Sequence, residues 1–208
     1  MNSADSGTEK DRRRLDELIE IARNFGTRGW TPATSGNYSV RLEDGAIAIT
    51  RSGADKRRLQ RADLMRLDAS GAALDDAEPS AEAKLHIQIY AHDPEARAVL
   101  HVHSPAATVV SRRASPADSI ILENYELLKA LEGVASHADS VALPIVPNDQ
   151  DMQRLAATVA PWLAQPDALP AYLIAGHGIY AWGRSVAAAA RHLEALDFVL
   201  NCELLEKR

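Results

Sequence analysis

The segment from Ala98 to Pro105 constrains the fold most, because an apolar run ends in two histidines and is followed by a helix start. His101 and His103 are two residues apart, and alternate residues of a β-strand project to the same face. Ser104 and Pro105 then supply the N-cap and first-turn chemistry of a helix. We therefore expect a buried strand that carries both imidazoles into one site, next to the start of a helix.

The composition is that of an ordinary soluble globular protein. The chain has 208 residues, of which 46% are hydrophobic and 25% are charged, so it is long enough for one α/β domain with a substantial core. The net charge of -6 argues against a general nucleic-acid binder, and no apolar run is as long as a membrane span. The polar N-terminus lacks the apolar region of a secretory signal, and the single cysteine, Cys202, fits a reducing compartment, so we expect a cytoplasmic protein.

Strand and helix patterns alternate along the chain, which predicts the α/β class with helices covering a mixed sheet. Predicted helices cover residues 15–25, 80–91, a segment from 105, 125–131, 151–163 and 185–207, and predicted strands cover 37–42, 46–50, 97–103, 140–146, 172–175 and 179–182. Gly26 is predicted to end the first helix and Ser80 to cap the second. Residues 1–8 are expected to be a disordered tail, and 9–208 a single domain.

His177 is predicted to complete a metal site with His101 and His103. Glycines on both sides of His177 let the backbone approach closely or take a positive φ. Three neutral imidazoles with an open fourth position are a catalytic zinc arrangement. The remaining histidines are expected to have structural or surface roles: His86, His92, His137 and His192.

Three polar loops precede the predicted metal strand and indicate a ligand that bears a phosphate. The first contains Thr34, Ser35, Gly36 and Asn37, the second contains Ser52, Gly53 and Lys56, and the third contains Ser80. Hydroxyl groups, accessible backbone N–H groups, a cation and a helix N-terminus all favour an anion. None of the loops matches a nucleotide P-loop or a dinucleotide-binding fingerprint.

Together these motifs resemble the class II (zinc-dependent) sugar-phosphate aldolases and their relatives. Thr-Ser-Gly-Asn, Ser-Gly, Pro-Ser-Ala-Glu, His-Val-His and Gly-His-Gly occur in the same order, and the resemblance spans about residues 12 to 205. It implies a three-layer α/β/α domain with a central mixed β-sheet and one zinc ion per subunit on His101, His103 and His177. It also implies that the three loops bind the substrate phosphate, and that the chain forms a homotetramer with sites at subunit interfaces.

Two segments resemble the dehydratases of this superfamily, which remove water from a methylthio-substituted ketose 1-phosphate in methionine salvage. Residues 52–56 read Ser-Gly-Ala-Asp-Lys, similar to the Ser-Gly-x-Asp-Lys of the dehydratases. Residues 126–129 read Glu-Leu-Leu-Lys, where the dehydratases carry a catalytic glutamate and the aldolases a tyrosine. The resemblance therefore implies that Glu126 is the catalytic acid/base. Glu82 matches the acid/base carboxylate of the aldolases, but animal dehydratases have a cysteine there, so Glu82 is the second candidate.

Both glutamates also have structural interpretations. Glu126 has Lys129 three residues later, and such a pair on a helix stabilises it by only about 0.2–0.5 kcal/mol. Glu82 falls in the first turn of a predicted helix, where the helix dipole alone favours an acid. It could equally be a zinc ligand that moves away when substrate binds.

Other functions fit many of the same residues. A class II ketose-1-phosphate aldolase of the fuculose or rhamnulose type, or a pentulose-5-phosphate 4-epimerase, would share the zinc and phosphate residues. A metal-free binding module resembling the adducin head domain would keep the fold, but the three intact histidines argue against it. In the enzyme interpretations the partner is a small sugar phosphate, with no role for nucleic acid or membrane.

Overall fold

A single eight-stranded sheet, in the order β3-β2-β1-β4-β8-β7-β6-β5, forms the centre of the molecule. The computed structural model describes residues 8–114, 119–165 and 168–206. The strands are β1 (Asn37–Arg41), β2 (Ile47–Thr50), β3 (Leu64–Leu67), β4 (Ala98–Val102), β5 (Ser119–Leu122), β6 (Val141–Val146), β7 (Ala171–Ile174) and β8 (Gly178–Gly183). Neighbouring strands are antiparallel except β6 and β7, which are parallel, so the predicted mixed sheet is confirmed.

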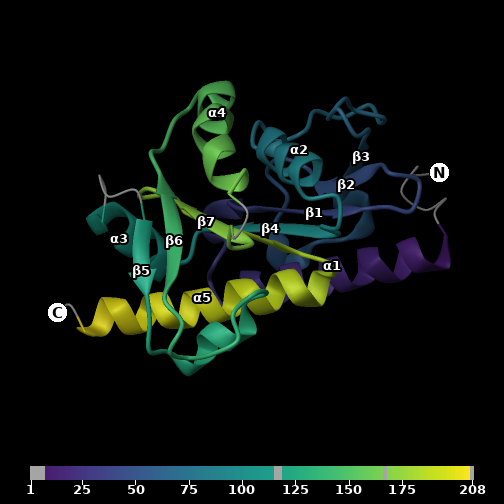
Figure 1. Ribbon diagram of the computed structural model, residues 1–208. Helices are drawn as coiled ribbons and strands as arrows, with labels where there is room; N and C mark the ends of the chain where they lie inside the picture. The colour runs from purple at the N-terminus through teal and green to yellow at the C-terminus, as the bar shows by residue number, and fades with distance from the viewer. Residues whose placement is uncertain (1–7, 115–118, 166–167, 207–208) are drawn as a thin grey trace.

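Helices cover both faces of this sheet (Figure 1). The helices α1 (Glu9–Thr27), α3 (Pro105–Ala114) and α5 (Val186–Glu206) pack on one face, and α2 (Ala83–His92) and α4 (Met152–Leu163) pack on the other. Short 3-10 helices are η2 (Pro32–Thr34), η3 (Lys56–Arg58), η4 (Arg61–Asp63) and η5 (Glu126–Ala130). The three-layer α/β/α architecture is thus confirmed. Among the described residues, no helix combines the length and the apolar character needed to cross a membrane.

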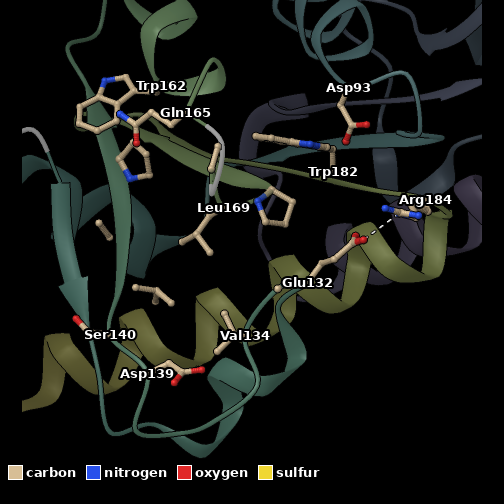
Figure 2. Close-up of a pocket in the computed structure, with 16 residues that line it drawn as sticks. Asp93, Glu132, Val134, Asp139, Ser140, Trp162, Gln165, Leu169, Trp182 and Arg184 are labelled. Carbon is tan, nitrogen blue, oxygen red and sulfur yellow. Dashed lines mark ion pairs between the residues drawn. The ribbon is translucent and has the colours of Figure 1, made fainter.

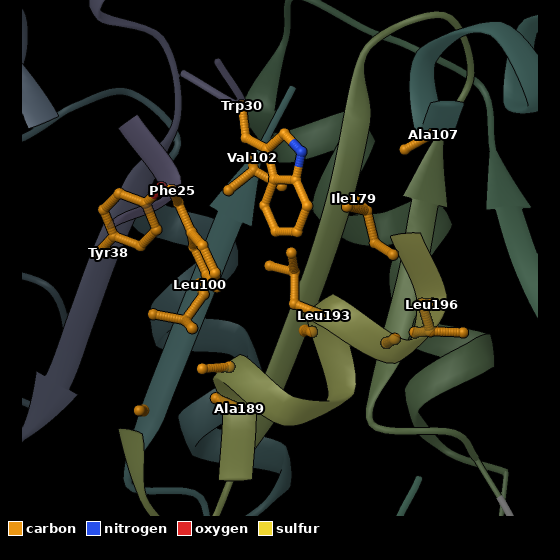
Figure 3. Packing of buried hydrophobic residues seen from close by; sticks show 14 of the residues in the cluster. Phe25, Trp30, Tyr38, Leu100, Val102, Ala107, Ile179, Ala189, Leu193 and Leu196 are labelled. Carbon is orange, nitrogen blue, oxygen red and sulfur yellow. The ribbon is translucent and has the colours of Figure 1, made fainter. Parts of the chain in front are cut away.

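Strand β4 lies near the middle of the sheet and contributes side chains to both cores. Leu100 and Val102 pack with Phe25 and with residues of α5 in the larger core, which Figure 3 shows. Val99 belongs to the second core, beneath α2 and α4. Because side chains alternate along a strand, His101 lies on the same face as Val99. The sheet therefore presents His101 toward the layer that contains α2.

Helix α1 is longer than the pattern from 15 to 25 predicts. Thr8 caps it through a capping box with Asp11, and residues 1–7 of the predicted tail lie outside the described residues. The prediction that Gly26 ends the helix is wrong, because Gly26 lies within it and Gly29 beyond the end takes the positive φ of 78°. Gly26 serves close packing instead, since a Cβ there would lie 2.8 Å from the side chain of Arg57.

The second predicted helix begins later than expected. The prediction that Ser80 caps it is wrong, because α2 begins at Ala83 and its N-cap residue is Glu82. The Ser80 carbonyl oxygen accepts a hydrogen bond from the Ala83 N–H, so Ser80 closes a turn before the helix. Glu82 makes no side-chain capping bond, which leaves its carboxylate available for other partners.

Two strands were not predicted. Each is four residues long and lies at an edge of the sheet: β3 at one end and β5 at the other. Such short segments carry little periodic signal, and an edge strand pairs on one side only. The strands β3 and β5 are therefore recognised only from their pairing with β2 and β6, respectively.

Candidate metal centre and active site

Three histidine side chains converge at the end of the sheet where β4 ends and β8 begins. The Nε2 atom of His103 lies 3.0 Å from Nε2 of His101 and 3.1 Å from Nε2 of His177. His101 is on β4, where it is paired with Asn37 of β1 and Tyr180 of β8. His103 follows the end of β4, and His177 lies in the turn between β7 and β8. The structure therefore brings together the three predicted metal ligands.

The backbone around His177 fits only with glycine neighbours. Gly176 has a φ of 64°, in the left-handed region that favours glycine. A Cβ on Gly178 would lie 2.2 Å from the carbonyl oxygen of Val102, so this residue allows the turn to approach β4. The Thr108 hydroxyl donates a hydrogen bond of 3.0 Å to the His177 carbonyl and ties the turn to α3. Both glycines thus have the roles expected of them.

The histidines of β4 are held neutral. Burial lowers the pKa of His101 well below its ordinary value and, with the neighbouring His177, lowers the pKa of His103 to about 4. A neutral imidazole carries one N–H, and the Nδ1 atom of His101 lies 3.0 Å from the Ile179 carbonyl oxygen. Nδ1 must therefore be the donor, which leaves a lone pair on Nε2 facing the other histidines. Converging neutral imidazole nitrogens fit a divalent metal of the zinc type.

A carboxylate lies beside these nitrogens. Glu82 Oε1 is 3.3 Å from Nε2 of His177, and Glu82 Oε2 is 3.4 Å from Nε2 of His101. The Asn37 side-chain amide donates to Oε2 across 2.6 Å, and the Tyr180 hydroxyl donates to the same oxygen across 3.0 Å. Four polar side chains from β1, β4, β8 and the turn before β8 therefore surround this glutamate.

Glu82 is ionised in this setting. Burial opposes its charge, but hydrogen bonding to His177, the nearby His101 imidazole and the Asn37 amide together hold the pKa of Glu82 well below its usual range. Its side chain is 19% exposed, so it still faces solvent on one side. An ionised carboxylate next to imidazole nitrogens can serve as a fourth metal ligand or as a proton acceptor.

The loops predicted to bind phosphate lie on the β1 and β2 side of this site. Lys56 is 2% exposed, and its Nζ donates a 2.7 Å hydrogen bond to the carbonyl oxygen of Thr34. Burial lowers the pKa of Lys56 to about 8. A β-bridge between Arg51 and Pro79 joins the segments that continue into Ser52 and Ser80. The structure thus connects the first loop to the second, and the second to the third.

The first loop has an unusual backbone and a hydroxyl without a partner. Thr34 has a φ of 63° and Gly36 a φ of 74°, and a Cβ on Gly36 would lie 2.6 Å from the His101 carbonyl oxygen. The Ser35 hydroxyl is buried and has no hydrogen-bond partner among the residues that the structure describes. Strained backbone and unpaired polar atoms are typical of ligand-binding segments.

Glu126 lies elsewhere. It starts η5, which packs on the outer side of α5 (Figure 1). Its side chain is 70% exposed. Its carboxylate pairs with Lys129, and His137 Nδ1 lies 3.8 Å away. The structure therefore does not bring Glu126 to the histidines within one chain, and the geometry is that of the exposed Glu–Lys pair considered in the sequence.

A cavity of about 570 Å³ opens over the histidines. Glu82, His103 and His177 form part of its lining. Its remaining lining comes from η2, from α3, from the turn before β8 and from the segment around the start of α4: Pro32, Pro105, Thr108, Val109, Asn148, Gln150, Met152 and Gly176. The cavity is thus polar at the histidines, and toward α3 and α4 it has both polar and apolar lining residues.

A second cavity, of about 640 Å³, lies at the opposite edge of the sheet and is shown in Figure 2. Trp162 and Trp182 line it, and Glu132 and Arg184 form an ion pair of 2.9 Å at its rim. None of the three clustered histidines lines this second cavity. The smaller cavity is the candidate active site because Glu82, His103 and His177 line it.

Sequence reasoning misses two contributors to this site. Tyr180 stacks on His101 and contacts Glu82, whereas its sequence context indicates only an aromatic of the core or pocket. His86 is predicted to be structural, yet its ring lies 2.5 Å from the Asn37 side chain that contacts Glu82. The sequence does carry a signal for these contacts. Asn37 and Ser39 are polar residues at alternate positions of β1, and His86 and Tyr90 are polar residues four positions apart on α2.

Comparisons with known proteins identify the family and the fold. Residues 16–204 match the family described as "Class II Aldolase and Adducin N-terminal domain". A methylthioribulose-1-phosphate dehydratase of Methylococcus capsulatus is 55% identical over 190 residues, which are 91% of this chain and 92% of that protein. One of Sorangium cellulosum is 48% identical over 91% of each chain. The structure of L-fuculose-1-phosphate aldolase from Thermus thermophilus superposes with a TM-score of 0.75 at 24% identity, covering 94% of this chain and 95% of that one.

Proposed function

Because the chain belongs to the class II aldolase and adducin N-terminal domain family, and within it to the methylthioribulose-1-phosphate dehydratases, we propose that it removes water from 5-methylthioribulose 1-phosphate. The product would be 2,3-diketo-5-methylthiopentyl 1-phosphate, and the reaction would be a step of methionine salvage in the cytoplasm. The observation that carries this proposal is the convergence of three imidazole Nε2 atoms, two of which, on His101 and His177, lie within 3.4 Å of the ionised carboxylate of Glu82.

The reaction requires a proton acceptor beside an activated carbonyl group. The C3 hydrogen is acidic because it is next to the C2 carbonyl, and the C4 hydroxyl is β to that carbonyl. Glu82 takes the C3 proton and returns a proton to the departing C4 hydroxyl, which leaves as water. The resulting enol rearranges to the 2,3-diketone. Acid–base assistance of this kind typically accelerates a reaction by about 10²–10⁴-fold.

The metal ion is proposed to be zinc, one per subunit, held by His101, His103 and His177. A divalent ion at this position supplies a Lewis acid for the C2 oxygen. The chain itself fixes the direction of the ligands, because the Ile179 carbonyl oxygen accepts from Nδ1 of His101.

The substrate is proposed to lie across the sheet edge with its phosphate toward the β1 and β2 loops. The buried ammonium group of Lys56 has Thr34 as its hydrogen-bond partner, and the Ser35 hydroxyl is unpaired among the described residues, so both can contact an anion. The far end of the substrate then extends toward α3 and α4. Val109 and Met152 line that side of the cavity and give the methylthio group an apolar surface.

Glu126 is retained as a catalytic candidate only in an oligomer. Its exposed position on η5 leaves it available to the site of another subunit, and the proposed assembly is a homotetramer. Within one chain, Glu82 is the carboxylate in contact with the histidines.

Product analysis tests the proposed function. The purified metal-loaded protein is incubated separately with 5-methylthioribulose 1-phosphate, fuculose 1-phosphate and rhamnulose 1-phosphate. Formation of the diketone from the first substrate alone supports the dehydratase. Dihydroxyacetone phosphate among the products would instead identify a C3–C4 aldolase. Turnover of none of the substrates, by a protein that takes up no stoichiometric metal when zinc is added, would favour a binding module.

A further inference from the structure

A buried chain of hydrogen bonds leads from the interior of the protein to Glu82. The Tyr90 hydroxyl lies 2.9 Å from Oγ of Ser39, which lies 2.7 Å from Nδ1 of His86. Nε2 of the same histidine lies 2.5 Å from Oδ1 of Asn37, whose Nδ2 donates to Glu82. Ser39 and His86 are fully buried, so they do not contact substrate directly.

Only one direction of donation satisfies the whole chain. Asn37 donates from its nitrogen to a carboxylate, so its oxygen must accept a hydrogen bond from the Nε2–H of His86. Burial lowers the pKa of His86 to about 3, so the ring is neutral and its Nδ1 is an acceptor. Ser39 must then donate to Nδ1 and accept from the Tyr90 hydroxyl. The ionised carboxylate of Glu82 is the final acceptor.

We infer that His86 is a positioning residue, which acts through Asn37 to hold the Glu82 carboxylate in its reactive orientation. The inference builds on the proposed function, in which Glu82 transfers the proton. Without the N–H of His86, the Asn37 amide loses the partner that fixes which of its ends faces the carboxylate.

The same contacts make the two oxygens of Glu82 unequal. Oε2 accepts from both Asn37 and Tyr180, whereas Oε1 faces His177. Because Oε2 already has two donors, Oε1 is the oxygen that is presented to a ligand in the cavity. His86 therefore contributes to the choice of the reacting oxygen, although it lies behind Asn37 as seen from the site.

Two substitutions of His86 separate positioning from core packing. His86→Gln places an amide N–H near the former Nε2 and keeps a donor for Asn37, whereas His86→Asn reaches only the former Nδ1 position. We expect His86→Asn to lower kcat about 10- to 100-fold with KM changed less than about threefold, and His86→Gln to retain kcat within about threefold. Metal content, measured by atomic emission, should stay at the wild-type level in both.

The matched control is His192, another buried histidine with hydrogen bonds to the backbone at Trp182 and Glu132. His192→Asn should lower the melting temperature and leave kcat unchanged. Ser39→Ala provides a second, smaller substitution in the chain if His86→Asn does not fold, and it should also lower kcat with little change in KM.

A double-mutant cycle and a spectrum complete the test. In a Glu82→Gln background, His86→Asn should have no further effect on kcat, and additive losses would overturn the inference. Replacing the metal with Co²⁺ gives an absorption spectrum that should change in His86→Asn but not in His86→Gln. This spectrum needs no turnover, so an unaltered spectrum in His86→Asn contradicts the positioning role even if the proposed substrate is wrong.

Discussion

Tyr180 stacks on His101 with ring centroids 4.1 Å apart and an interplanar angle of 13°. Its hydroxyl also donates to Oε2 of Glu82, so one side chain contacts both a proposed metal ligand and the proposed acid/base. The stack continues to Tyr172, whose ring lies 5.0 Å further along. This column packs against one face of the His101 ring.

Tyr180→Phe should preserve the stack and remove only the hydroxyl. We expect kcat to fall about tenfold, because a hydrogen bond to a charged group is lost, while the metal content stays unchanged. Steady-state kinetics and metal analysis on the same preparation check this. A loss of metal would mean that the hydroxyl supports the histidines instead of Glu82.

His101→Ala should abolish both metal binding and activity, because it removes one of three converging imidazoles. In a thermal-shift assay, added zinc should raise the melting temperature of the metal-free wild type and not that of the variant. His92→Ala, on the exposed end of α2, is the control and should respond like wild type. Equal zinc stabilisation of His101→Ala would contradict the metal centre.

Substitution of Glu82 and of Glu126 should have different effects, which mixing the two variant proteins can reveal. Glu82→Gln should lower kcat by about 10²–10⁴-fold, and Glu126→Gln should do the same only if Glu126 acts across a subunit boundary. Mixing the two inactive variants under conditions that exchange subunits should then restore part of the activity. A wild-type rate for Glu126→Gln would remove that residue from the mechanism.

The stability of the metal-free protein should fall with acid. The pKa of His86 is lowered from 6.5 to about 3 by burial, so between these values the unfolded chain binds a proton that the folded chain does not. Unfolding free energy therefore rises with pH in this window, and His86 contributes a slope of up to about 1.36 kcal/mol per pH unit. Urea unfolding from pH 4 to pH 7 should show a shallower slope for His86→Gln, and an identical slope would contradict the neutral buried histidine.

Met152→Ala should change substrate preference. We expect kcat/KM for 5-methylthioribulose 1-phosphate to fall about tenfold, since apolar contact of this size contributes about 1–3 kcal/mol. Ribulose 1-phosphate, which has a hydroxyl in place of the methylthio group, should be affected much less. Met152→Leu is the matched control and should keep the preference; an equal loss for both substrates would place the methylthio group elsewhere.

The shared direction of His101 and His103 and the close turn at His177 could be predicted from sequence because each depends on neighbours along the chain. The two-residue spacing of His101 and His103 fixes a shared strand face, and the glycines beside His177 indicate a close turn. The confirmed α/β architecture follows from alternating patterns that do not depend on distant partners. Sequence and structure agree wherever the neighbours along the chain determine the conformation.

Features that depend on tertiary partners could not be predicted in the same way. Glycine often follows the last residue of a helix, but Gly26 lies inside α1, where it packs closely against Arg57. His86 has no motif of its own, and its significance comes from Ser39 and Asn37 on another strand. The position of Glu126 on the outer side of α5 likewise depends on how η5 packs, which its Glu–Lys spacing does not report.

The long separation of the three clustered histidines along the chain determines when the site can form during synthesis. His103 and His177 are 74 residues apart, and the carbonyl that orients His101 is 78 residues beyond it. A nascent chain that has left the ribosome only as far as β6 therefore has two of the three imidazoles, and β4 still lacks its neighbour β8. The three histidines can therefore meet only after the turn between β7 and β8 has emerged, and until then an edge of the central strand is open to chaperones or to aggregation.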